Sequence, residues 1–158
     1  MPYLIDGYNL LWSIFKNDEH FEPVDDAGLV STVSLYCQDM RDYGEVVFDG
    51  IGPPNKRPFK QVASVDVVFS GQGIEADDVI EHKIACCRSP KKLCVVSSDR
   101  RVRRAAEKAK AQVFRSDEFW AMVLKRLLRK RGPKEPLGKR HGVTDEETLE
   151  WLKQFGLD

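Results

Sequence analysis

The sequence predicts a three-layer α/β/α domain with a mainly parallel central sheet, followed by a short helical C-terminal appendage. Two observations carry this prediction. Short apolar runs of strand length alternate along the chain with longer segments of helical periodicity. Strands separated by helices pair in parallel through right-handed crossovers, which place helices on both faces of the sheet. A chain of 158 residues without an internal repeat suits one such domain.

The predicted elements follow one another in regular order. The strands are expected at residues 3–5, 45–50, 64–70, 92–99 and 111–114, and the helices at residues 10–15, 29–40, 77–87, 102–109 and 117–130. Each strand is a short run rich in Val, Ile and Phe, and most are bounded by Gly, Ser or Asp. Each helix repeats its apolar residues every three or four positions. A loop rich in Pro and Gly occupies residues 50–58.

The C-terminal part of the chain has a different composition. We assign residues 1–120 to the domain and residues 121–158 to a basic helical extension that packs on it or trails from it. After the helix at 117–130 we expect a linker punctuated by Gly and Pro, and then a final helix. That last helix is predicted by a capping box at Thr144, Asp145, Glu146 and Glu147.

Composition argues against two classes of protein. No apolar stretch approaches the roughly 20 residues that a membrane span needs, and the N-terminus lacks a signal-peptide pattern, so we expect a cytoplasmic protein without a membrane anchor. Cys37, Cys86, Cys87 and Cys94 show no C-x-x-C spacing. This spacing favours reduced structural thiols over a zinc site.

Acidic residues follow four of the predicted strands. They are Asp6, Asp49, the cluster of Glu75, Asp77 and Asp78, and Asp99. Because the carboxyl ends of parallel strands meet at one edge of a sheet, we expect these side chains to converge. A single Asp there is often only a helix cap, but several carboxylates together repel one another unless a cation neutralises them. Oxygen ligands of this kind suit Mg²⁺ or Mn²⁺, so the sequence favours a metal site over unrelated caps.

Four segments resemble a known family. They are LIDGYNLLW (residues 4–12), VVFDG (46–50), VVFSGQGIEADDVIE (67–81) and VVSSDRRVRRAA (95–106). In this order and in so short a chain, they are similar to the YacP-like NYN-domain ribonucleases of the PIN-like and 5′-nuclease superfamily. The resemblance spans nearly the whole chain. It implies a PIN-like sheet and metal-dependent cleavage of RNA, with ribosome-bound mRNA as a candidate substrate.

The resemblance implies roles for the residues that match its motifs. Asp6, Asp77 and Asp99 match the acids that hold the metal, directly or through water. Asn9 matches an accompanying asparagine that orients a ligand or contacts a water on the metal. Ser98 matches the residue that precedes the acid of the fourth strand.

Further acids match less uniformly. Glu75 and Asp78 match the 5′-nuclease pattern, and either is a candidate proton acceptor for the attacking water, while Asp49 is given a supporting role. Flap nucleases carry another acid two positions after the fourth-strand aspartate, where this chain has Arg101. This departure argues against a tightly bound second metal.

Three functions from different classes are compatible with these residues. The first is a metal-dependent endoribonuclease that cuts single-stranded RNA with a metal-activated water and leaves 5′-phosphate and 3′-hydroxyl ends. The second is a noncatalytic RNA- or ribosome-binding module with the same fold. The third is a phosphatase or phosphotransferase of the haloacid dehalogenase type, which expects a second Asp two residues after Asp6, where this chain has Tyr8. The acid set favours the first.

Basic residues cluster in two places despite a net charge of zero. Arg100, Arg101 and Arg104 begin the helix after Asp99, where they are candidates for clamping phosphates. A second run near the C-terminus predicts docking on RNA or the ribosome, although such a run is also typical of a solvated helix face. It comprises Lys125, Arg126, Arg129, Lys130, Arg131, Lys134, Lys139 and Arg140.

Tyr8 and Trp12 are four residues apart, just before and within the first predicted helix. Aromatic residues in helices usually belong to the core, and we expect both side chains there. The alternative is that they stack on unpaired bases, as in proteins that bind single strands.

Overall fold

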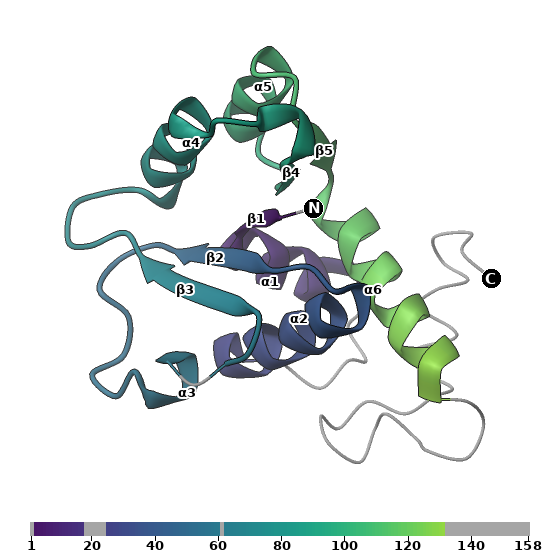
Figure 1. Ribbon diagram of the computed structural model, residues 1–158. Coiled ribbons are helices and arrows are strands. Elements are labelled where there is room, and N and C mark those ends of the chain that lie inside the picture. Colours follow the sequence, from purple (N-terminus) through teal and green to yellow (C-terminus); the bar gives the residue numbers. More distant parts are fainter. Residues whose placement is uncertain (1, 18–24, 61, 132–158) are drawn as a thin grey trace.

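The computed structural model describes residues 2–17, 25–60 and 62–131 of the chain (Figure 1). The final helix predicted from Thr144, and the basic residues Lys134, Lys139 and Arg140, lie outside these residues. Within the described ranges, no helix is long and apolar enough to cross a membrane.

A five-stranded parallel sheet forms the centre of the molecule, which confirms the predicted fold class. The strands are β1 (Tyr3–Asp6), β2 (Gly44–Phe48), β3 (Val65–Phe69), β4 (Cys94–Val96) and β5 (Gln112–Phe114). Their order is β3-β2-β1-β4-β5, so β1 is the central strand. Ile5 pairs with Val46 of β2 on one side and Val96 of β4 on the other.

Helices cover both faces of the sheet (Figure 1). The longer ones are α1 (Gly7–Asn17), α2 (Asp26–Met40), α4 (Ala76–Cys86), α5 (Arg100–Lys108) and α6 (Ser116–Arg131). Side chains of α1, α2 and α6 pack with Tyr3 and Ile5 on one face. Those of α4 and α5 pack with Leu4 on the other. The alternation along β1 therefore divides the core into two layers.

One short helix appears where the sequence predicted an irregular loop. Helix α3 (Arg57–Lys60) begins at the end of that loop, and its Phe59 is buried. The Phe59 ring lies 5.3 Å from the ring of Phe69 and 6.2 Å from that of Phe48, measured between centroids. This aromatic packing fixes a turn of helix in a segment whose Pro and Gly content indicated only a loop. A 3₁₀ turn, η1 (Pro90–Lys92), precedes β4.

Helix α6 runs through residue 120 without a break. Phe119 and Trp120 are buried up to that position, and Val123, Leu124 and Leu127 are buried after it. All five belong to the core layer that α1 and α2 also fill. The described part of the extension is therefore packed on the domain, and the division of the chain at residue 120 stays a prediction.

The expectation that Tyr8 and Trp12 belong to the core is wrong. Tyr8 is 38% exposed and Trp12 is 68% exposed, whereas Leu10 and Ile14 of the same helix are buried. At 100° per residue, Tyr8 and Trp12 lie about 60° and 100° around the helix axis from the buried Leu11, outside the stripe of α1 that packs on the sheet. The apolar periodicity of the helix is satisfied without them.

Candidate metal centre at the carboxyl edge of the sheet

The carboxyl ends of the strands bring four aspartates to one edge of the sheet. Asp6 ends β1, Asp49 follows β2, and Asp77 lies in the first turn of α4 after β3. Asp99 precedes α5 after β4. Because all five strands are parallel, these positions share an edge. The charges interact: Asp77, Asp49 and Asp99 each raise the pKa of Asp6.

Asp6 is a buried carboxyl with a strongly shifted pKa. Burial is the largest cause and the neighbouring aspartates add to it, so that the pKa rises from 3.8 to about 7. The hydroxyl of Ser97 donates a hydrogen bond of 3.1 Å to Oδ2 of Asp6, which acts in the opposite direction. Gly7 follows directly, and a Cβ atom there would lie 2.4 Å from the ring of Phe48. Glycine therefore lets α1 begin immediately after the carboxyl.

Ser97 is a site residue that the sequence analysis missed. It is fully buried, and its Oγ accepts a hydrogen bond of 3.0 Å from the backbone N–H of Asp99 while donating to Asp6. One hydroxyl thus links the ends of β1 and β4. The signal in the sequence was the doubled serine before Asp99, of which only Ser98 was selected.

Asn9 and Ser98 connect three elements beside the acids. Oδ1 of Asn9 accepts a hydrogen bond of 2.8 Å from the backbone N–H of Ser98 and one of 2.6 Å from Oγ of Ser116. The backbone N–H of Ser116 donates in turn to Oγ of Ser98, at 3.1 Å. Ser116 is fully buried at the start of α6, and the sequence analysis did not select it. The group joins α1, the end of β4 and α6, which fixes the backbone around Asp99.

Asp49 and Asp77 meet at the start of α4. Oδ1 of Asp49 accepts a hydrogen bond from the backbone N–H of Ala76, the first residue of that helix. The carboxylate of Asp49, just after β2, thereby accepts a hydrogen bond from a free N–H group at the start of the helix that follows β3. Asp77 is half-buried, and its pKa is raised first by burial and then by Asp99, while Arg101 acts to lower it.

Asp99 caps α5. Its Oδ1 accepts hydrogen bonds from the backbone N–H groups of Arg101, at 2.8 Å, and Val102, at 3.2 Å. A cap and a metal ligand are compatible roles for one carboxylate, because both of these bonds use the same oxygen.

Arg101 lies among carboxylates rather than on an open basic surface. Its guanidinium pairs with Glu81 at 2.8 Å, with Asp78, and with Glu75 at 3.4 Å. Glu81 was not selected from the sequence. The structure therefore brings Glu75 and Asp78 to this exposed ion-pair network. The proposed contact of Arg101 with RNA has to compete with these three acids.

The other basic candidates lie in two separate places. Arg100 and Arg104 are exposed on α5. On α6, Arg126 pairs with Asp39 of α2, and Arg129 is exposed nearby, while Lys130 and Arg131 occupy the last two positions of the helix. The two groups belong to helices on opposite faces of the sheet (Figure 1).

The donor set at the carboxyl edge suits a hard divalent cation. Asp6 and Asp77 both have raised pKa values because burial and like charges disfavour their ionised forms. A bound cation would relieve both effects. In the part of the chain that the structure describes, no three His, Cys, Asp or Glu side chains form a ready-made metal cluster. The residues at this edge therefore fit a cation that is held directly by one or two carboxylates and otherwise by water, as Mg²⁺ usually is.

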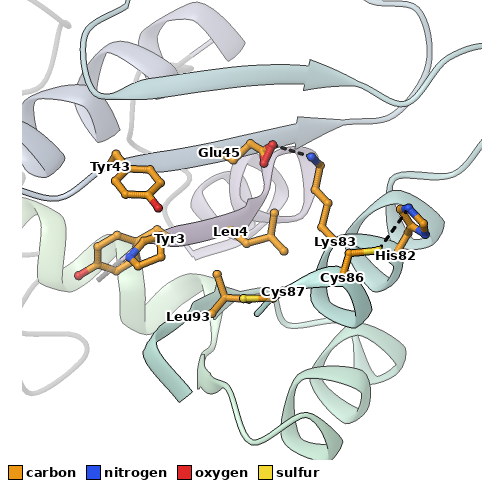
Figure 2. A pocket seen from close by; sticks show the side chains of 10 residues that line it. Tyr3, Leu4, Tyr43, Glu45, His82, Lys83, Cys86, Cys87 and Leu93 are labelled. Carbon is orange, nitrogen blue, oxygen red and sulfur yellow. Dashed lines mark hydrogen bonds and ion pairs between the residues drawn. The ribbon is translucent and has the colours of Figure 1, made fainter. Parts of the chain in front are cut away.

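A cavity of about 410 Å³ lies at the opposite end of the strands (Figure 2). Tyr3, Tyr43 and Leu93 at or before the starts of strands contribute to its walls, with His82 and Cys86 from α4. Lys83 and Glu45, which form an ion pair of 2.6 Å, also line it. None of the predicted site residues lines this cavity, so it is separate from the acidic edge.

The fold and the acidic edge define a class: a parallel α/β domain with carboxylates gathered at the ends of its central strands. Comparison with family models identifies the group within that class. The model of the YacP-like NYN domain matches residues 3–151, and the chain belongs to this family. The resemblance seen in the sequence is thereby confirmed, and membership supports a nuclease-like, RNA-related function.

Solved structures show the same fold. The chain is similar to the crystal structure of Rae1 (YacP) from Bacillus subtilis, with 23% identity and a TM-score of 0.61, over 99% of this chain and 94% of that one. A substitution mutant of the same protein gives 24% identity and a TM-score of 0.58, over 99% and 97%. Comparison with curated proteins gave no match.

Proposed function

We propose that this protein is a metal-dependent endoribonuclease that cleaves single-stranded RNA. The observation that carries the proposal is the group of four aspartates at the carboxyl edge, with Asp6 buried and its pKa raised to about 7. A domain of the YacP-like NYN family with such an excess of negative charge is suited to bind Mg²⁺ or Mn²⁺ beside a phosphodiester. Hydrolysis by water would leave 5′-phosphate and 3′-hydroxyl ends.

The residues divide into three roles under this proposal. Asp6, Asp77 and Asp99 would hold the cation, directly or through water, and a cation bound there would supply Lewis acidity to the phosphate and lower the pKa of water. Ser97 keeps the Asp6 carboxyl in place through its hydrogen bond to Oδ2. Asp49 fixes the start of α4 and so the position of Asp77.

Proton transfer from the attacking water needs an acceptor, and Glu75 and Asp78 are the two candidates. Both are paired with Arg101 in this structure. For either to accept a proton, the carboxylate has to leave that ion pair. Surface ion pairs contribute only about 0–1 kcal/mol, so this release is energetically accessible.

The natural substrate is proposed to be mRNA on the ribosome, which would place the protein in the cytoplasm. Support comes from the family and from the basic residues of α6, where Arg126 and Arg129 are exposed. A map of new 5′ ends in the RNA of cells with and without the protein would test this directly. Cleavage confined to translated regions would support the ribosome as partner, and cleavage independent of translation would contradict it.

The reaction itself is tested by incubating purified protein with single-stranded RNA, DNA of the same sequence, and a phosphomonoester. Each is supplied with Mn²⁺, with Mg²⁺ or with chelator, and RNA is also offered as mRNA on ribosomes. We expect RNA cleavage that requires the cation. RNA binding without cleavage in any condition would instead favour a noncatalytic module, and hydrolysis of the monoester would favour a phosphatase.

A further inference from the structure

Helix α1 carries an aromatic face next to the acidic edge. Tyr8, Trp12 and Phe15 lie within about 60° of one another around the helix axis. They are 38%, 68% and 46% exposed. The helix starts directly after Asp6, so Tyr8 stands two residues from the buried carboxyl, and Trp12 stands one turn, about 6 Å, further along.

Tyr8 is held beside the acids by its own contacts. Its ring lies 4.8 Å from the ring of Phe48, between centroids and at 56° between planes. Phe48 is the last residue of β2 and precedes Asp49. The charge of Asp49 also contributes to the raised pKa of Tyr8, after burial and Asp26. The aromatic face is therefore continuous with the edge where the proposed function places the phosphate.

The chemistry of the aromatic face indicates which part of an RNA it would bind. The exposed rings of Tyr8 and Trp12 offer flat apolar surfaces and carry no charge that would pair with a phosphate backbone. A nucleobase carries no charge and presents a flat π surface, which exposed aromatic rings bind by stacking. Bases are free to stack in this way only where they are unpaired.

We infer that Tyr8 and Trp12 form a stacking platform for unpaired bases next to the phosphate held at the acidic edge. This inference rests on the proposed function and specifies its substrate. The bases beside the scissile phosphate must be unpaired, so a double-stranded segment would not fit. It also gives the aromatic residues of α1 a part in binding that is separate from the carboxylates.

Trp12 is the residue to change, because its exposure makes Trp12→Ala compatible with folding. Binding of a labelled single-stranded RNA is measured in chelator at low ionic strength, so that no cleavage occurs. We expect Trp12→Ala to bind about five- to a hundredfold more weakly than wild type, and Trp12→Phe to retain most of the affinity. The matched control is Tyr43→Ala, since Tyr43 is 63% exposed beside the cavity at the other end of the sheet (Figure 2).

A second RNA separates stacking from contacts with phosphate. An oligonucleotide of the same length with abasic sites keeps its phosphates and loses its bases, so wild type and Trp12→Ala should bind it equally weakly. The fluorescence of Trp12 gives an independent signal: RNA should quench part of the emission of wild type, and Trp12→Phe should lose that part. Trp120, at 2% exposure, is shielded from such quenching.

Two results would overturn the inference: equal RNA binding by wild type and Trp12→Ala, or no detectable binding by wild type. Cleavage of RNA by wild type is measured in parallel with Mn²⁺. This assay distinguishes a failure of the stacking platform from a failure of the proposed nuclease activity. If wild type cleaves RNA but Trp12→Ala binds it equally well, the platform fails and the nuclease stands. If binding depends on bases and on Trp12 without any cleavage, the platform stands and the nuclease fails.

Discussion

Asp6 has an environment that opposes its ionisation. The carboxyl is 5% exposed at the end of the central strand, and its pKa is raised to about 7 by burial and by the aspartates around it. In the unfolded chain the same group has a pKa near 3.8. Between these values the folded state binds the proton more strongly than the unfolded state. The free energy of unfolding therefore decreases as pH rises from about 4 to about 7, and Asp6 contributes no further change above that range.

This linkage predicts a pH-dependent effect of Asp6→Asn. In chelator, the variant should melt several degrees above wild type at pH 8, because a neutral amide replaces a buried charge and still accepts the hydrogen bond from Ser97. The difference should shrink as pH falls towards 4, where the wild-type carboxyl is protonated. The measurement is a series of melting curves. A variant that melts below wild type by the same amount at every pH would show that Asp6 is only a structural cap.

Asp77 and Asp49 should differ in their importance for activity. Asp49→Asn keeps an oxygen that accepts from the Ala76 N–H, so we expect a loss of cleavage of about ten- to a hundredfold at most. Asp77→Asn removes a charge that faces the other acids, and we expect a larger loss. Values of kcat/KM for an RNA that wild type cuts decide the matter. Equal losses would mean that Asp49 is not merely supporting.

At the scale of elements, the start of α5 combines a helix cap with a candidate metal ligand. Oδ1 of Asp99 accepts from two backbone N–H groups, and an amide oxygen at the same place can do so as well. Asp99→Asn should therefore keep the metal-free stability of wild type, whereas Asp99→Ala should lose about 0.5–2 kcal/mol. Both should lose cleavage.

Melting in chelator and a cleavage assay on the two Asp99 variants test this separation. Full activity of Asp99→Asn would restrict Asp99 to capping. A loss of metal-free stability in Asp99→Asn as large as in Asp99→Ala would show that the charge itself, rather than the hydrogen bonds, holds the start of α5.

The order and type of the main elements followed from apolar periodicity, because burial of one face dictates that period in both strands and helices. Tyr8 and Trp12 were misplaced for the same reason: periodicity shows which residues are apolar but not which face of α1 the sheet already fills. Ser97 and Ser116 were missed because a hydroxyl becomes important only through partners distant in sequence. Arg101 was selected by its charge, and its three acidic partners on or beside α4 appear only once the helices pack.

Across the whole molecule, a net charge of zero conceals a separation of charge. Acids gather at the carboxyl edge, while basic residues continue along α6. Such a separation suits a polyanion whose backbone is held at one place and cut at another. Arg126 is partly neutralised by Asp39, so the other basic residues of α6 are expected to carry more of the effect.

Neutralising the α6 residues Arg126, Arg129, Lys130 and Arg131 together should weaken association with RNA or ribosomes and flatten its dependence on salt. Each lost phosphate contact should reduce the slope of log K against log[salt] by about 0.7 for a single strand. A salt titration of binding measures this slope. An unchanged slope would remove α6 from the binding surface.

The control for the α6 variant is Lys91→Gln with Lys92→Gln. Both lysines are exposed in η1, which precedes β4 and so lies at the amino end of the strands. This control should leave the salt dependence as in wild type. A change as large as that in the α6 variant would mean that overall charge, rather than the position of α6, determines binding.

The central claim is that the aspartates at the carboxyl edge hold a divalent cation, and its most direct test is a titration of melting temperature with Mn²⁺. A cation that binds only the folded state stabilises it by about 2.7 kcal/mol at a hundredfold excess over its Kd, which raises the melting temperature by about 5–10 °C in a chain of this size. Wild type should show this rise, as should Asp66→Asn, whose side chain is exposed on β3. Asp6→Asn and Asp77→Asn should lose it. An equal rise in all four proteins, or none in wild type, would contradict the account.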